Sequence, residues 1–167
     1  MRTIDEMDSR IIDILQTDAR VANAEIARQV GMAPSATLER LRKLEERGVV
    51  RGYTASVDPR AVGLGLLAFV FVRAQGTTAL AEETERALAA IPEAQEVHHI
   101  AGEDCFILKV RVADAEALGR LLRQRIASIP TVVSTRTTIV LNTVKETTAL
   151  PMPAAAEGNG HGGRSDG

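Results

Sequence analysis

The sequence predicts an α+β protein in two parts, an N-terminal winged helix-turn-helix domain followed by a ferredoxin-like β-α-β-β-α-β domain. In residues 23–52, two short amphipathic segments are separated by Gly31 and followed by a β-prone segment, which is the spacing of a helix-turn-helix. From residue 66 onward, strand-like apolar runs alternate with helical periods in the order β-α-β-β-α-β.

Three helices are predicted in the first part. The first covers residues 4–17, where apolar residues recur at helical spacing from Met7. For the second we expect Asn23 as the N-cap and Gly31 as a left-handed C-cap.

The third helix is expected to begin near Pro34, with Ser35 as its candidate cap, and to end before Gly48. Its inward face is predicted to carry Leu38, Leu41 and Leu44. Residues 49–57 are β-prone, and we expect them to form a wing or a linker strand.

The second part is expected to pack two helices against one face of a sheet. Its predicted elements are strands over 66–74, 95–101, 105–112 and 132–144, a helix over 78–91, and a second helix capped by Asp114. The face of the sheet without helices would then be exposed to water. A second copy of the same sheet could pack on it, so we expect at least a homodimer.

The predicted domain boundaries follow from these elements. We expect a helix-turn-helix domain over 1–52, a linker strand or hinge over 53–65 and the ferredoxin-like domain over 66–150. Residues 151–167 are rich in Pro, Gly and Ala, and we expect a disordered tail there.

Composition excludes several classes of protein. The single Cys105 excludes an internal disulfide framework and a cysteine-based zinc site. His98 and His99 are adjacent on a strand and face opposite sides, so we expect no metal site there and no cofactor. Neither a signal peptide nor a membrane span is apparent, which predicts a cytoplasmic protein with no membrane partner.

Basic charge is local rather than global. The net charge is −2, yet residues 40–52 carry five basic against two acidic residues. This is the distribution expected of a helix that enters the DNA major groove while its exit segment meets phosphates. The candidate DNA contacts are Ser35, Ala36, Thr37, Glu39, Arg40, Lys43, Arg47 and Arg51. A solvated face with pairs such as Glu39–Lys43 is the alternative.

Several motifs resemble the Lrp/AsnC family of transcription regulators, also called feast/famine or leucine-responsive regulators. They are MDSRIIDILQTDAR (7–20), the segment from Glu25 to Gly63, VHHIAGEDCFILKV (97–110) and TVVSTRTTIVLNTVK (131–145). The resemblance covers residues 4–150 and implies a nucleoid-associated regulator that binds a pseudo-palindromic operator in double-stranded DNA. It also implies assembly from dimers toward octamers.

The resemblance further implies that a small effector, usually an amino acid, binds the C-terminal domain near Gly102, Glu103, Asp104 and Cys105. A carboxylate in this turn could take the ammonium of an amino acid, and backbone amides around Gly102 its carboxylate. The alternative is an acidic turn that is simply solvated. Cys105 stands where the family commonly has a second Asp, so the choice of effector stays open.

Two other functions remain open on the sequence alone. One is an effector-binding partner protein that does not read DNA. The other is an enzyme resembling the sirohaem decarboxylases, which the acidic balance from residue 53 onward and the scarcity of histidine disfavour. With no nucleophile–base pair and no phosphate loop, the sequence predicts a protein that is not an enzyme.

Overall fold

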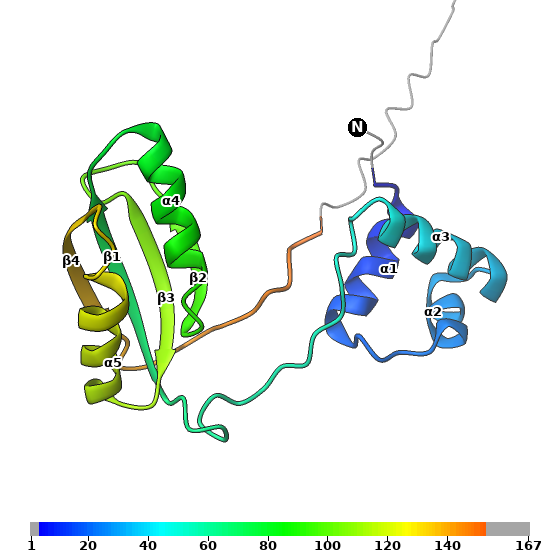
Figure 1. The fold of residues 1–167 in the computed structure, drawn as a ribbon. Helices are drawn as coiled ribbons and strands as arrows, with labels where there is room; N and C mark the ends of the chain where they lie inside the picture. Colours follow the sequence, from blue (N-terminus) through cyan, green and yellow to red (C-terminus); the bar gives the residue numbers. More distant parts are fainter. Residues whose placement is uncertain (1–3, 153–167) are drawn as a thin grey trace, which may run out of the picture. The chain divides into compact units, whose positions relative to one another are not determined.

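The computed structural model describes residues 4–152, which form two units joined at two points of the chain (Figure 1). We call residues 4–55, together with residues 146–152, the helical unit. The sheet unit is Ser56–Lys145. No helix among residues 4–152 is long and apolar enough to cross a bilayer.

The helical unit contains α1 (Glu6–Thr17), α2 (Asn23–Val30) and α3 (Pro34–Glu46). α1 begins where Asp5 caps it, because the Asp5 side chain accepts a 2.8 Å hydrogen bond from the backbone N–H of Asp8. Apolar side chains from all three helices meet in one core, centred on Ile11, Ile26 and Leu44.

The turn between α2 and α3 has the predicted left-handed Gly31, with φ 72°. The two predicted caps are wrong, since neither α2 nor α3 has a side-chain cap hydrogen bond. Asn23 is already the first residue of α2, and its side-chain N–H instead donates to the carbonyl of Pro34 at 2.9 Å. Pro34 stands at the start of α3 as expected. Because proline has no backbone N–H, it leaves no unsatisfied donor in the first turn of the helix.

The inward face of α3 is rotated from the predicted one. Leu38 is 48% exposed, whereas Thr37 is fully buried. Thr37, Leu41 and Leu44 form the inward stripe at i, i+4 and i+7, and the Thr37 hydroxyl donates to the Ala33 carbonyl at 3.2 Å. A buried threonine is tolerated because this bond satisfies its polar group.

Residues 49–57 form neither the predicted wing nor a linker strand. The amides of Val49 and Val50 both donate to the carbonyl of Leu44, at 2.9 and 3.2 Å, so the chain is tied to the end of α3. No strand of the described chain lies beside this segment to pair with it.

The sheet unit has the predicted β-α-β-β-α-β order. Its strands are β1 (Leu66–Ala74), β2 (Ala94–His99), β3 (Phe106–Val112) and β4 (Val132–Ile139), antiparallel in the order β2-β3-β1-β4. Its helices are α4 (Thr78–Ala89) and α5 (Ala115–Leu121), the latter continuing as a π-helical turn over Leu122–Ile126. Asp114 caps α5 as predicted, accepting from the Ala117 amide at 2.7 Å.

Both helices cover the same face of the sheet (Figure 1). Val70, Val72 and Leu108 are fully buried beneath them. The alternate residues of β1 and β3, including Phe69, Phe71 and Ile107, lie on the face without helices, which we call the open face.

The last strand is shorter than predicted. β4 pairs only with β1, and the pairing ends at Ala68↔Ile139, with one further bond from the Val140 amide to the Leu67 carbonyl. β1 begins at Leu66, so within the described chain residues 141–144 have no strand to pair with.

The last described residues belong with the helices by their contacts. Residues 146–152 group with the helical unit rather than with the sheet unit. Of the predicted disordered tail, Pro151 and Met152 belong to the described chain, and residues 153–167 lie outside it.

Candidate functional site

The outward face of α3 is the first candidate site. Ser35, Ala36, Glu39 and Lys43 are exposed there. Lys43 and Glu39 form the expected i, i+4 pair at 3.2 Å, with both side chains more than half exposed. Such a pair is weak and leaves the ammonium accessible to a phosphate.

Arg40 is held inside the helical unit. Its Nη1 donates to Asp5 Oδ2 at 2.6 Å and to Asp8 Oδ1 at 2.8 Å. These bonds raise the pKa of Arg40, and the backbone N–H of Asp8 followed by Arg40 lowers the pKa of Asp5. Arg47 lies 3.9 Å from the same Asp8. The predicted DNA contact by Arg40 is therefore in competition with an internal role.

Thr37 is removed from the candidate contacts. It is fully buried and its hydroxyl is used within α3, so it cannot reach a base. Thr37 was a candidate because it lies at the start of α3, the part of a recognition helix that usually reaches bases.

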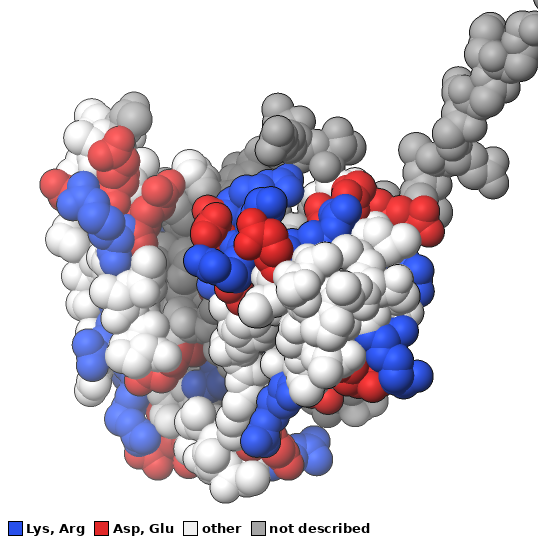
Figure 2. Space-filling view, turned by 90° about the vertical axis from the view of Figure 1, so that its right-hand side faces the viewer, with Lys and Arg blue, Asp and Glu red and all other residues white. Residues whose placement is uncertain are grey.

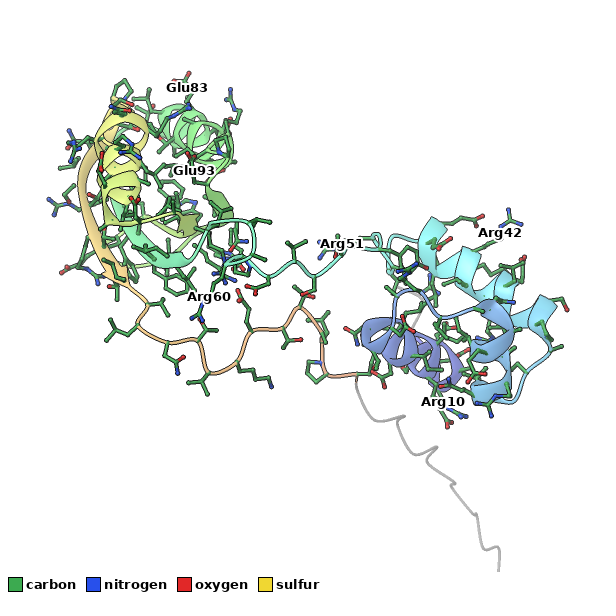
Figure 3. All side chains as sticks on the ribbon, turned by 90° about the horizontal axis from the view of Figure 1, so that it is seen from below. Arg10, Arg42, Arg51, Arg60, Glu83 and Glu93 are labelled. Atoms are coloured by element: carbon green, nitrogen blue, oxygen red, sulfur yellow. The ribbon has the colours of Figure 1, made fainter. Side chains whose placement is uncertain are left out.

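Arg42 is a candidate that the sequence reasoning did not select. It is exposed, makes no ion pair with any residue from 4 to 152, and projects outward from α3 (Figure 3). It lies opposite the stripe of Thr37, Leu41 and Leu44. Helical spacing therefore indicates that Arg42 faces outward, but only once the buried stripe is known. Arg51, on the segment that leaves α3, is also exposed and unpaired within the described chain (Figure 3).

Charge on one face of the molecule is mixed in sign. On the face shown in Figure 2, basic and acidic side chains lie in small mixed groups. DNA contact would depend on the α3 face and on Arg51 rather than on general attraction.

The turn between β2 and β3 is the second candidate site. Gly102 has φ 147°, and Glu103 is exposed without an ion pair in the described chain. Asp104 accepts a 2.9 Å hydrogen bond from Arg136 of β4. Cys105 points back to the sheet, its thiol donating to the Ala74 carbonyl at 3.3 Å and its amide to the Val72 carbonyl at 2.9 Å.

Arg136 is a further residue that sequence reasoning missed. Its guanidinium lies 4.0 Å above the ring centre of Phe71 while it holds Asp104. Phe71 and Arg136 are register partners on β1 and β4, so they share the open face. The cation thus anchors the acidic turn to the sheet.

The two histidines point to opposite sides, as the sequence predicted. His98 lies 3.2 Å from Glu96, whose pKa is lowered by His98 and then by Lys109. His99 lies 3.0 Å from Glu85 of α4 and packs against Phe106. Among residues 4–152 no three metal-ligating side chains come together.

Comparison with known proteins decides the family. The model of the AsnC-type helix-turn-helix domain matches residues 4–45, and that of the Lrp/AsnC ligand-binding domain matches residues 67–150. This chain belongs to the Lrp/AsnC family. It is a DNA-binding transcription regulator under effector control, built from a helix-turn-helix domain and a ligand-binding domain.

Relatives of known role span nearly the whole chain. An HTH-type transcriptional regulator of Pyrococcus horikoshii is 42% identical over 149 residues, which cover 89% of this chain and 97% of that protein. The leucine-responsive regulatory protein of Escherichia coli is 35% identical over 150 residues, covering 89% and 92%.

Solved structures of Lrp/AsnC proteins agree with the fold. A transcriptional regulator of Neisseria meningitidis in complex with L-methionine gives a TM-score of 0.85 at 32% identity, covering 89% of this chain and 97% of that one. A feast or famine regulatory protein of Mycobacterium tuberculosis, also complexed with L-methionine, gives 0.82 at 38% identity, covering 90% and 100%. Both relatives therefore bind an amino acid.

Proposed function

We propose that this Lrp/AsnC regulator binds a pseudo-palindromic operator as a homodimer, through the exposed face of α3, and that an amino acid controls it from the turn at 102–105. The observation that supports DNA binding is the set of exposed cations Arg42, Lys43 and Arg51. Of these, Arg42 and Arg51 have no ion pair within the described chain. Ser35, Ala36 and Glu39 at the exposed start of α3 are the proposed base contacts, since the N-terminal part of such a helix reaches base edges.

The open face supports the dimer. Phe69, Phe71 and Ile107 are half-buried there without a covering helix, and a second copy of the sheet would remove them from water. A two-fold axis would also place two copies of α3 at the spacing of two half-sites, roughly 34–36 Å. Further association of dimers, up to an octamer, is part of the proposal, and light scattering measures it.

Glu103 is the proposed partner for the ammonium group of the effector. Asp104 is already neutralised by Arg136, whereas Glu103 has no ion pair in the described chain. Backbone N–H groups around Gly102, whose φ of 147° suits glycine, are the proposed partners for the carboxylate. Cys105 faces the Ala74 carbonyl, so we assign it to the support of the turn rather than to the ligand.

Membership of a regulator family supports the view that the chain is not an enzyme. A DNA partner supports a location in the cytoplasm, at the nucleoid. We assign it no metal or organic cofactor, because the proposed ligand is a free amino acid.

Fluorescence anisotropy with DNA from upstream of its own gene tests the proposal, at physiological salt, with and without L-methionine and then the other amino acids. We expect specific binding whose affinity or stoichiometry changes with one amino acid. Glu103→Gln should remove that response and leave DNA affinity unchanged, while Glu83→Gln on α4 should alter neither.

Absence of specific DNA binding under every condition would refute the DNA-reading half. It would favour an effector-binding partner protein if an amino acid still raised the melting temperature.

A further inference from the structure

The C-terminal segment contacts α1 through a paired set of hydrogen bonds. The Leu150 amide donates to Gln16 Oε1 at 2.6 Å, and Gln16 Nε2 donates to the Leu150 carbonyl at 3.0 Å. A glutamine side chain carries one acceptor and one donor group, so it satisfies both backbone groups of a single residue here. The contact joins residues 134 positions apart in the sequence.

A second contact comes two residues later. Met152 packs against the core of the helical unit that Ile11, Ile26 and Leu44 form. The Leu150 side chain itself is 67% exposed, so the segment is held by its backbone and by Met152. Polar and apolar contacts thus anchor the same short stretch.

The chain consequently connects the two units twice. The first connection follows Ala55 and the second precedes Glu146. The second begins at β4, the strand whose Arg136 holds Asp104 of the effector turn.

We propose that residues 146–152, which we call the strap, are a structural part of the DNA-binding domain of their own chain. The segment is thereby assigned to a different domain from the one that its place in the sequence suggests. The inference goes beyond the proposed function, because it holds whichever effector binds and whichever operator is read.

Two truncations test whether the strap belongs to the domain. One ends the chain after Lys145 and removes the strap; the control ends it after Met152 and keeps it. We expect the control to have the same hydrogen exchange in α1 and the same melting temperature as the full chain. The shorter chain should exchange faster in α1 and melt several degrees lower. Equal exchange in α1 for both truncations would overturn the proposal.

A milder variant covers the case in which the shorter chain fails to fold. Gln16→Ala removes both hydrogen bonds to Leu150 and keeps the full chain. We expect exchange of the Leu150 amide to rise by up to about tenfold. The matched control is Gln29→Ala on α2. In the described chain the Gln29 side chain donates to Glu25, so this variant should leave exchange of the Leu150 amide unchanged. An unchanged Leu150 amide in Gln16→Ala would contradict the contact.

Chemical cross-linking tests whether the strap stays on its own chain. The variant carries Gln16→Cys and Leu150→Cys in a Cys105→Ser background and is treated with a short bismaleimide. Cross-linking at the mass of a single chain supports the proposal. A covalent dimer as the main product would show that the strap comes from a second copy, and would overturn it. Neither readout involves DNA or an effector, so failure here is distinct from failure of the proposed function.

Discussion

Arg40 on α3 donates a 2.8 Å hydrogen bond to Asp8 on α1, and so joins the recognition helix to the helix behind it. The same guanidinium also holds Asp5, the cap of α1. The Asp8 side chain is only 10% exposed, so loss of its cation would leave a poorly hydrated carboxylate. Arg40 therefore positions α3.

Arg40→Ala should destabilise the helical unit. Two charge-assisted hydrogen bonds disappear and Asp8 loses its nearest partner, so we expect a loss of about 1–3 kcal/mol in the free energy of unfolding. Chemical denaturation measures it. Arg28→Ala, which breaks a surface i, i+3 pair with Glu25, is the control and should have little effect. Unchanged stability in Arg40→Ala would return Arg40 to the candidate DNA contacts.

Arg42→Ala should weaken DNA binding without loss of stability. The side chain is exposed and unpaired in the described chain, so its removal costs no internal contact. If it meets a phosphate, the slope of log affinity against log salt should fall by about 1 per site. Arg86→Ala on the exposed face of α4 should leave that slope unchanged. An equal slope for Arg42→Ala and the full chain would exclude this contact.

The single tyrosine offers a direct probe of the segment that leaves α3. Burial, then the hydrogen bond from Tyr53 to Glu45 at 2.8 Å, raises the pKa of Tyr53 to about 12. Tyr53 is the sole tyrosine and the chain has no tryptophan, so absorbance of the tyrosinate reports this residue alone. Glu45→Gln should lower the measured pKa toward its ordinary value of 10.0.

The same shift sets a dependence of stability on pH. The pKa of Tyr53 is higher in the folded chain than in the unfolded chain. Its contribution to the free energy of unfolding is therefore complete below pH 10 and is lost as the pH rises toward 12. Tyr53→Phe should reduce the difference in stability between neutral and alkaline pH. A folded protein with a tyrosine pKa near 10 would disprove the contact.

Phe69→Glu should dissociate the proposed dimer. A carboxylate on the open face would be buried against a second sheet, which is costly without a partner. Light scattering after gel filtration measures the mass. Leu141→Glu, at a side chain 97% exposed, is the matched control and should keep the mass of the parent protein. Retention of that mass by Phe69→Glu would place the dimer contact elsewhere.

Periodicity was enough for most of the fold. A near-continuous apolar run predicted β1 with its observed bounds, Asp114 marked the start of α5, and Gly31 marked the end of α2. Local signals act within a few residues, so the sequence displays them directly. The cap assigned to Asn23 failed because that side chain reaches Pro34, eleven positions away.

In the candidate sites, too, features set by local spacing were predictable and features set by packing were not. The exposure of Lys43 and its pair with Glu39 follow from helical spacing alone. The burial of Thr37 and the exposure of Leu38 do not, because a change of one residue in the inward stripe rotates a helix by about 100°. That rotation is set by the core into which α3 packs.

By itself the sequence determined the two domain types, the order of their elements and the location of the acidic turn. It did so because turns, caps and apolar periods are encoded within short windows. Only the tertiary structure decided which cations are free, which residue holds Asp104, and to which unit the C-terminal segment belongs. Those outcomes depend on contacts such as Arg40–Asp5, Arg136–Asp104 and Gln16–Leu150, whose partners lie 32 to 134 positions apart and are selected by packing.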